Sequence, residues 1–196
     1  MNANYDNLMQ ETLKSEKGKK ILLHACCAPC ATSVCERLKE DAKLALFWYN
    51  PNIQNKPEHD KRLENLRFLA KEYSLPLLEG GCVAGQFEQA VEGYEKEKEG
   101  GARCPLCFYL RLFVTAMIAK ENGFDYFCTT LTVSPHKNAN AINKIGEEIA
   151  EKVGIKWLYS DFKKRNGYLR SIQLSKELGL YRQNYCGCDY GRQAED

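Results

Sequence analysis

Five short apolar runs alternate with longer segments of helical spacing, and this alternation is the strongest constraint on how the chain folds. The runs cover residues 20–25, 44–49, 75–78, 125–132 and 155–159. The segments with helical spacing cover residues 28–40, 58–73, 86–99, 105–121, 139–153 and 171–178. Strands that alternate with helices are typical of a parallel sheet covered by helices. The sequence therefore predicts an α/β fold with a doubly wound, mostly parallel five-stranded sheet.

We expect residues 1–196 to form a single catalytic α/β domain with a cysteine-bearing C-terminal tail over about residues 163–196. The 28 basic and 26 acidic residues leave a net charge of only +2, which excludes a protein that coats nucleic acid non-specifically. No segment approaches the ~20 apolar residues of a membrane span. The first residues also lack the apolar stretch of a signal peptide. These features predict a cytoplasmic chain with no membrane partner.

Polar and cysteine-rich motifs follow the ends of three predicted strands. They read HACCAPC over residues 24–30, NPN over residues 50–52 and TTLTVSPHK over residues 129–137. In open α/β sheets, ligands bind beyond the carboxyl ends of the strands, where such loops converge. We therefore expect one site to gather all three motifs. Its candidate substrate contacts are Asn50, Asn52, Thr130, Ser134, His136 and Lys137.

Ten cysteines are unusual in a chain of this predicted location. Reducing compartments seldom keep structural disulfides, and cysteines that are merely buried rarely cluster in short motifs. Metal binding or redox chemistry is therefore the leading interpretation. Structural disulfides of the thermophile kind remain an alternative, because the chain is also rich in lysine and glutamate.

Two cysteine pairs suit metal ligation. Cys26 and Cys27 come where the first strand ends, and a turn there would let both thiols face one ligand. Cys104 and Cys107 lie one turn apart around Pro105, at a predicted helix start. The free N–H groups of a helix start favour thiolates and can donate to an iron–sulfur cluster. Two flanking arginines, Arg103 and Arg111, add positive charge.

Four thiolates can hold either tetrahedral zinc or a [4Fe–4S] cluster, and spacing alone does not separate the two. We favour the cluster, because adjacent cysteines fit one small zinc ion poorly whereas a cubane offers separate irons. Cys186 and Cys188 form a CxC pair whose disulfide would be strained and labile, which predicts a redox role. The alternative is that this pair replaces another pair as cluster ligands. Cys30 competes in the same way within the first motif.

The remaining cysteines and most histidines read as structural. Cys35 and Cys128 fall inside a predicted helix and strand, and Cys82 follows a Gly-Gly loop, so all three are expected to be inert thiols. His24 lies in the first apolar run and is expected to be a core histidine. His136, beside Lys137, is the one histidine considered for catalysis or phosphate contact.

Five motifs in order resemble the QueH-type epoxyqueuosine reductases, the cobalamin-independent enzymes of queuosine biosynthesis. The motifs are LLHACCAPC (residues 22–30), YNPNI (49–53), RCPLCFYLRL (103–112), TTLTVSPHKN (129–138) and YCGCDYG (185–191). The resemblance covers nearly the whole chain, with no departure at the cysteines. It implies a fold similar to the adenine-nucleotide α-hydrolase and PP-loop type of sheet. It also implies reduction of epoxyqueuosine to queuosine at the tRNA wobble position, by two-electron removal of the epoxide oxygen.

The resemblance also implies roles for particular residues. It places a [4Fe–4S] cluster on Cys26, Cys27, Cys104 and Cys107, and a redox-active disulfide on Cys186 and Cys188. An additional mononuclear iron is implied as an option, with Cys30 and Asp189 as candidate ligands, and no cobalamin is expected. Asp189 is also a candidate for proton delivery. An external electron donor must reopen the disulfide.

For tRNA, basic residues of the tail and of nearby loops form a candidate anticodon surface, with Tyr168 or Tyr181 stacking on a base. The basic residues are Lys137, Lys144, Lys163, Lys164, Arg165, Arg170 and Arg182. Two other functions compete with the reductase. One is a PP-loop-like tRNA-thiolation enzyme, although the usual Ser-Gly-Gly-x-Asp-Ser phosphate loop is missing. The other is a zinc-stabilised RNA-binding module, which would have no use for the CxC pair.

Overall fold

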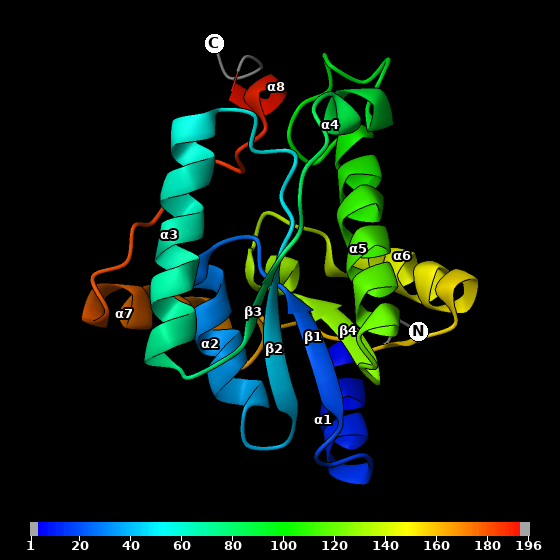
Figure 1. The fold of residues 1–196 in the computed structure, drawn as a ribbon, viewed down its shortest axis with the longest axis vertical. Helices are drawn as coiled ribbons and strands as arrows, with labels where there is room; N and C mark the ends of the chain where they lie inside the picture. The colour runs from blue at the N-terminus through cyan, green and yellow to red at the C-terminus, as the bar shows by residue number, and fades with distance from the viewer. Residues whose placement is uncertain (1–3, 193–196) are drawn as a thin grey trace.

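A computed structural model describes residues 4–192, and its centre is a five-stranded sheet in which all strands are parallel (Figure 1). Across the sheet the order is β3 (Leu77–Glu79), β2 (Lys43–Trp48), β1 (Lys20–His24), β4 (Tyr126–Thr129) and β5 (Lys156–Trp157). This confirms the predicted α/β class and the number of strands. The register pairs His24 with Phe47 on one side and with Thr129 on the other.

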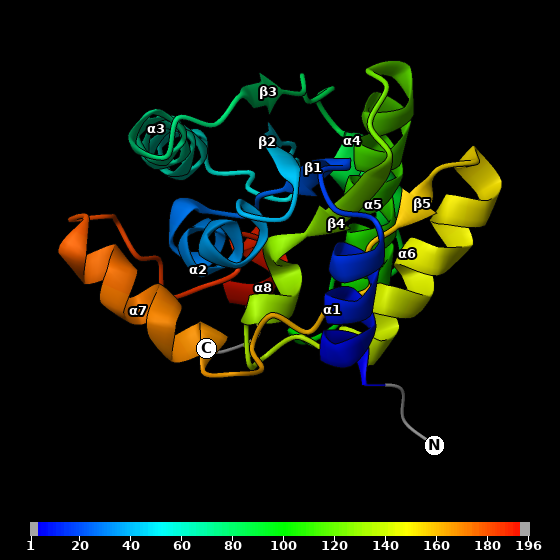
Figure 2. The ribbon, with the colours of Figure 1, turned by 90° about the horizontal axis from the view of Figure 1, so that it is seen from below.

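Helices cover both faces of the sheet. The helices are α1 (Tyr5–Ser15), α2 (Ala28–Leu38), α3 (Lys56–Glu72), α4 (Gln86–Ala90), α5 (Arg103–Glu121), α6 (Ala139–Val153), α7 (Gly167–Glu177) and α8 (Asp189–Arg192). Helices α2 and α7 pack together, α3 contacts α2, and α5 packs on α6 across the sheet from them (Figure 2). Helix α2 connects β1 to β2 on one side of the sheet centre, and α6 connects β4 to β5 on the other side. This reversal at β1 and β4 leaves a crevice at their carboxyl ends.

The central strands are apolar throughout because both of their faces are buried. Leu22 and Leu23 point to opposite faces of β1, and neither is exposed. At the β5 edge, α6 approaches closely because residue 146 is glycine. A Cβ atom there would lie 2.3 Å from the ring of Trp157. None of the helices in the described part of the chain is long and apolar enough to cross a bilayer.

The predicted helix over residues 86–99 is wrong beyond its first turn, because α4 ends at Ala90 and turns follow. Gly93 then takes a φ of +82°, which breaks helical geometry. The buried guanidinium of Arg103 accounts for the irregular backbone, since it donates to the carbonyl oxygens of Tyr94, Glu95 and Glu97. Those carbonyls bind the arginine instead of helix N–H groups.

The fourth strand is also shorter than predicted, because β4 ends at Thr129 and the 3-10 helix η1 (Thr130–Val133) follows. The Thr129 hydroxyl starts this turn by accepting from the Leu131 N–H. Smaller differences affect β3, which is shifted to Leu77–Glu79, and β5, which is only two residues long. Helices α1 and α8 have no counterpart among the predicted elements. Helix α1 nevertheless has an N-cap, in which Asn4 accepts from the Asn7 N–H.

Candidate metal and substrate site

Three thiols cluster where β1 ends and α2 begins. The sulfur atoms of Cys26, Cys27 and Cys30 all lie within 4.8 Å of one another, and those of Cys26 and Cys27 are 3.8 Å apart. Cys27 is the N-cap of α2 and Cys30 lies in its first turn, so the helix start turns both sulfurs back toward Cys26. We call these three the first sulfur group. Within residues 4–192, these three cysteines are the group whose ligand atoms lie close enough together to bind one metal ion.

The three thiols bond to one another, and this shifts their pKa values in opposite directions. Hydrogen bonds from Cys27 and Cys30 hold the pKa of Cys26 well below its usual range, and Arg111 and the Thr130 hydroxyl act in the same direction. The same contacts with Cys26 raise the pKa of Cys27 to about 12 and also raise that of Cys30. A bound metal cation would displace protons from these thiols, because metals bind thiolates.

Four further cysteines border a small cavity beside the start of α5, and we call them the second sulfur group. They are Cys104, Cys107, Cys186 and Cys188. Cys104 accepts from the Gly100 N–H at 3.2 Å. Burial raises the pKa of Cys107 to about 12, and the nearby Arg111 opposes this rise only in part. Cys188 is buried against Phe87 and Cys107 in a small apolar cluster.

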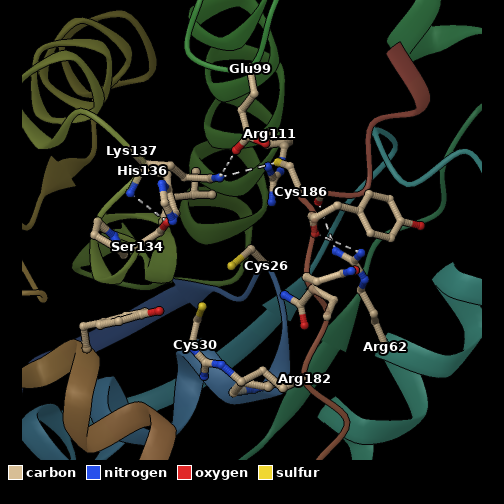
Figure 3. Close-up of a pocket in the computed structure, with 17 residues that line it drawn as sticks. Cys26, Cys30, Arg62, Glu99, Arg111, Ser134, His136, Lys137, Arg182 and Cys186 are labelled. Carbon is tan, nitrogen blue, oxygen red and sulfur yellow. Dashed lines mark hydrogen bonds and ion pairs between the residues drawn. The ribbon is translucent and has the colours of Figure 1, made fainter. Parts of the chain in front are cut away.

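A cavity of about 560 Å³ opens between the two sulfur groups (Figure 3). Cys26 and Cys30 line it from the β1 end, and Cys186 lines it from the second group. The rest of the wall is rich in cations and aromatic rings, and includes Arg62, Arg111, His136, Lys137, Tyr168, Arg182 and Tyr185. Thiols from both sulfur groups therefore line this one polar cavity.

Two cations hold Cys186 at the wall of this cavity. The Lys137 ammonium lies 3.5 Å from the Cys186 sulfur and 3.4 Å from a Glu99 oxygen (Figure 3). Burial opposes the charge of Lys137, but the Cys186 sulfur and Glu99 outweigh it and raise the pKa of this lysine. On the other side, Arg62 donates to the carbonyl oxygens of Cys186 and Tyr185 at 3.0 and 3.2 Å.

The predicted substrate contacts divide into two sets. Ser134, His136 and Lys137 lie on the cavity wall. Thr130 lies deeper, where its hydroxyl accepts from the Cys26 N–H at 3.0 Å and contacts the Cys26 sulfur at 3.2 Å.

The two asparagines of the NPN motif are buried and are not among the residues that line the cavity. Asn50 donates to the Ala25 carbonyl and accepts from Arg111. Neither side-chain amide atom of Asn52 has a partner among the described residues.

Asp189 begins α8, and its N–H donates to the Gln54 side chain at 3.2 Å. Its carboxylate is not among the described groups that line either cavity. Cys35 and Cys128 are buried as expected, whereas Cys82 is exposed. His24 is a buried core residue that bonds to the Thr129 hydroxyl and the Tyr49 carbonyl. Burial, with the positive charge of Arg111, lowers the pKa of His24 to about 3 and keeps it neutral.

The candidate tRNA residues also divide. Tyr168 and Arg182 lie on the cavity wall, and the guanidinium carbon of Arg182 is 5.4 Å from the Tyr168 ring centroid. Tyr181 instead bonds to Glu58 and stacks under Lys61. Several of the predicted cations are engaged by carboxylates: Lys163 by Asp161, Arg165 by Asp6, and Arg170 by Glu36 and Glu177. Lys144 and Lys164 are exposed.

Sequence reasoning missed Arg62 and Glu99. Arg62 lies on a charged helix, and only its spacing of four residues from Glu58 hints at a pair. Its burial, at 2% exposure, depends on the tail that docks over it. Glu99 is the last residue of the predicted helix over residues 86–99, and no local signal separates it from its acidic neighbours.

Comparison with known proteins shows which family this chain belongs to. Residues 21–194 match the family model described as epoxyqueuosine reductase QueH. The chain belongs to this family. A QueH from Streptococcus pyogenes serotype M1 is 41% identical over 197 residues, covering 95% of this chain and 77% of the relative. A QueH from Thermotoga maritima is 40% identical over 171 residues, covering 86% and 88%. A third, from Staphylococcus epidermidis, is 37% identical and covers 94% and 83%.

The donor set of this QueH chain fits a soft metal centre. Both sulfur groups offer thiols alone, which suit zinc or an iron–sulfur cluster and not a hard cation such as magnesium. Arg111 is buried beside them with one guanidinium nitrogen, Nε, that has no partner within residues 4–192. A buried cation that has no carboxylate partner within residues 4–192 is consistent with a centre that carries negative charge.

Proposed function

We propose that this chain reduces epoxyqueuosine to queuosine in tRNA. The substrate gains two electrons and two protons, the epoxide oxygen leaves as water, and a carbon–carbon double bond remains. The family assignment supports this reaction, and the structure supports it with one observation above all. Cys26, Cys30 and Cys186 open onto the same cavity, so redox-active sulfur from both groups can reach one bound nucleoside. Because the substrate is tRNA, the proposed place of action is the cytoplasm.

The proposed ligands of a [4Fe–4S] cluster are Cys26, Cys27, Cys104 and Cys107. Cys30 competes for this role, since its sulfur is within 4.8 Å of those of Cys26 and Cys27. A second iron, with Asp189 as a candidate ligand, remains part of the proposal. When bound, such a centre would supply electrons one at a time and a Lewis acid for the charge that develops on the epoxide oxygen.

Cys186 and Cys188 are proposed as the source of the electron pair. Their two thiols would close to a disulfide as the epoxide loses its oxygen, which balances the reaction, and an external dithiol or electron-transfer protein would reopen it. Lys137 is placed to stabilise the Cys186 thiolate, because its ammonium donates to that sulfur. Asp189, next to Cys188 in the chain, remains a candidate for proton delivery.

Recognition of the nucleoside is proposed to use the aromatic and cationic wall of the cavity. Tyr168 offers a ring for stacking, and Arg182 offers charge for a phosphate of the anticodon loop. The cavity volume of about 560 Å³ falls in the usual range for small-ligand sites. It is large enough for one extruded nucleotide.

The test is an anaerobic purification followed by a tRNA assay. Iron, zinc and sulfide per chain are measured with the visible spectrum, and tRNA that contains epoxyqueuosine is incubated with protein and reductant. We expect roughly four irons with matching sulfide, and conversion of the nucleoside to queuosine by mass spectrometry. Stoichiometric zinc, no colour and no conversion would overturn the proposal and leave a structural metal in an RNA-binding domain.

A further inference from the structure

Arg111 is a buried cation without a carboxylate partner. It lies on α5, one turn after Cys107, and its side chain is only 2% exposed. Within residues 4–192 it forms no ion pair with an aspartate or glutamate, whereas the equally buried Arg62 pairs with Glu58 at 2.7 Å. A guanidinium out of water is unfavourable unless negative charge compensates it.

The acidic groups that act on Arg111 are thiols. Its Nη1 donates to the Cys107 sulfur at 3.9 Å. Burial disfavours the charged form of Arg111, but Cys107, Cys26 and Cys186 outweigh burial and raise its pKa. Figure 3 shows the guanidinium between Cys186 and Cys26, on the wall of the large cavity. One cation therefore interacts with thiols of both sulfur groups.

A neutral amide holds this cation in place. Arg111 Nη2 donates to Asn50 Oδ1 at 2.5 Å, and Asn50 Nδ2 donates to the Ala25 carbonyl at 3.0 Å, just before Cys26. An aspartate at position 50 would bond to the guanidinium equally well but would cancel its charge. The asparagine orients Arg111 and leaves the whole positive charge available to the sulfur atoms.

We propose that Arg111, oriented by Asn50, is the fixed positive charge that raises the reduction potential of the iron–sulfur centre. This inference rests on the proposed function, because it requires that the thiols hold such a centre. Reduction by one electron adds one negative charge, and a nearby cation in a water-poor site stabilises the reduced form more than the oxidised form. Asn50 then acts as a positioning residue and not as a substrate contact.

The experiment is a redox titration of the anaerobically purified holoprotein, with dithionite as reductant, followed by its visible and electron paramagnetic resonance spectra. The variants are Arg111→Gln, Arg111→Lys, Asn50→Asp and Asn50→Ala. We expect Arg111→Gln and Asn50→Asp to disfavour one-electron reduction by about tenfold or more, which is about 59 mV toward negative potential. Arg111→Lys keeps the charge and should stay near the wild type. Asn50→Ala loses both side-chain hydrogen bonds of Asn50 without adding a negative charge, and it should shift the potential less than Asn50→Asp does.

The outcomes separate this inference from the proposed function. Wild-type protein without iron and sulfide would overturn both. An iron-loaded Arg111→Gln protein with the wild-type potential would overturn the inference alone. If Arg111→Gln does not retain iron, the comparison of Asn50→Asp with Asn50→Ala decides, because equal potentials for those two variants would also overturn the inference.

Discussion

Cys186 and Cys188 have different surroundings although a single glycine separates them. Cys186 is half-buried on the cavity wall beside Lys137, whereas Cys188 is buried against Phe87 and Cys107. If both are redox thiols, replacing either with serine should reduce turnover by a factor of ~100 or more, in the range of losing an essential catalytic group. The iron content and visible absorbance should stay unchanged, which is checked by metal analysis and spectroscopy on each variant.

The matched control for these variants is Cys82→Ser, because Cys82 is exposed and lies on neither cavity wall within the described chain. It should keep both turnover and absorbance. Loss of iron from Cys186→Ser or Cys188→Ser would instead identify that cysteine as a ligand of the centre.

Gly187 is required between the two thiols because its backbone and its surroundings both exclude a side chain. It has a φ of +107°, and a Cβ atom would lie 2.8 Å from Ile53 and 3.0 Å from the Arg62 guanidinium. We expect Gly187→Ala to reduce the free energy of unfolding by about 1–3 kcal/mol, and to displace Cys186 so that turnover falls. Denaturant unfolding measures the first effect. Gly179→Ala, at a φ of +62° with no atom within 4 Å, should lower stability less and leave turnover unchanged.

His24 makes the stability of the protein depend on pH. Its pKa is about 3 in the folded protein, against about 6.5 in an unfolded chain. Below pH 6.5 the unfolded chain therefore binds a proton that the folded protein does not. The free energy of unfolding should fall by about 2 kcal/mol between pH 7 and pH 5, as denaturant titrations at each pH would show.

The variant His24→Gln should remove most of this dependence between pH 7 and pH 5, although it lowers stability at both. The carboxyl groups of Asp6 and Asp125 have lowered pKa values and add their own loss of stability at lower pH, near and below pH 4. An unchanged slope in His24→Gln would show that another group titrates.

At the scale of elements, α3 holds the segment that carries the CxC pair. Arg62 on α3 donates to two carbonyl oxygens of that segment, and Glu58 one turn earlier accepts from both Arg62 and Tyr181. Lysine cannot make these contacts with a planar, multidentate group. We expect Arg62→Lys to increase hydrogen exchange of backbone amides in residues 185–191 and to reduce turnover about tenfold or more, since hydrogen bonds of charged groups contribute about 1.5–3 kcal/mol each.

Arg67→Lys is the control on the same helix. Arg67 is exposed and pairs with Glu64 and Glu79 at the surface. Exposed pairs contribute about 0–1 kcal/mol, so neither exchange nor turnover should change. If Arg62→Lys behaves like Arg67→Lys, α3 does not position the segment.

The elements that the sequence predicted well are those with strong periodicity or apolar runs. Helix α6 matches its predicted bounds of 139–153, because Asn138 caps its start and Gly154 ends it in the left-handed region. The helix predicted over residues 86–99 failed because a buried side chain that follows it in the chain, Arg103, binds its carbonyl groups. Local patterns do not record such a contact.

At the scale of the molecule, binding of tRNA should depend on salt through cations near the cavity. Arg182 is exposed on the cavity wall, so we expect Arg182→Ala to weaken binding and to reduce the slope of log K against log salt by about 1. Binding is measured by fluorescence anisotropy at several salt concentrations. Arg67→Ala is the control and should leave the slope unchanged. An unchanged slope in Arg182→Ala would remove this residue from the interface.

The sequence predicted which loops form the site but not how they divide the cysteines. Strand ends placed the HACCAPC and TTLTVSPHK motifs together, and Cys26 does bond to Thr130. The approach of Cys186 to Lys137 and Arg62 depends on how the tail crosses the sheet, which no periodicity encodes. The grouping of Cys30 with Cys26 and Cys27 likewise follows from the turn at the start of α2, which spacing alone left open.

The order of segments along the chain has a consequence for maturation of the protein. All five strands and Arg111 are synthesised before Cys186 and Cys188, because β5 ends at Trp157. The first sulfur group can therefore form on a folded sheet while the cavity still lacks the wall that carries Cys186. If the proposed iron–sulfur centre is assembled on these thiols, a donor of iron and sulfide would reach Cys26 and Cys30 more easily before the tail docks. Docking of the tail onto Arg62 would then add the part of the cavity wall that carries Cys186 and reduce access to the first sulfur group.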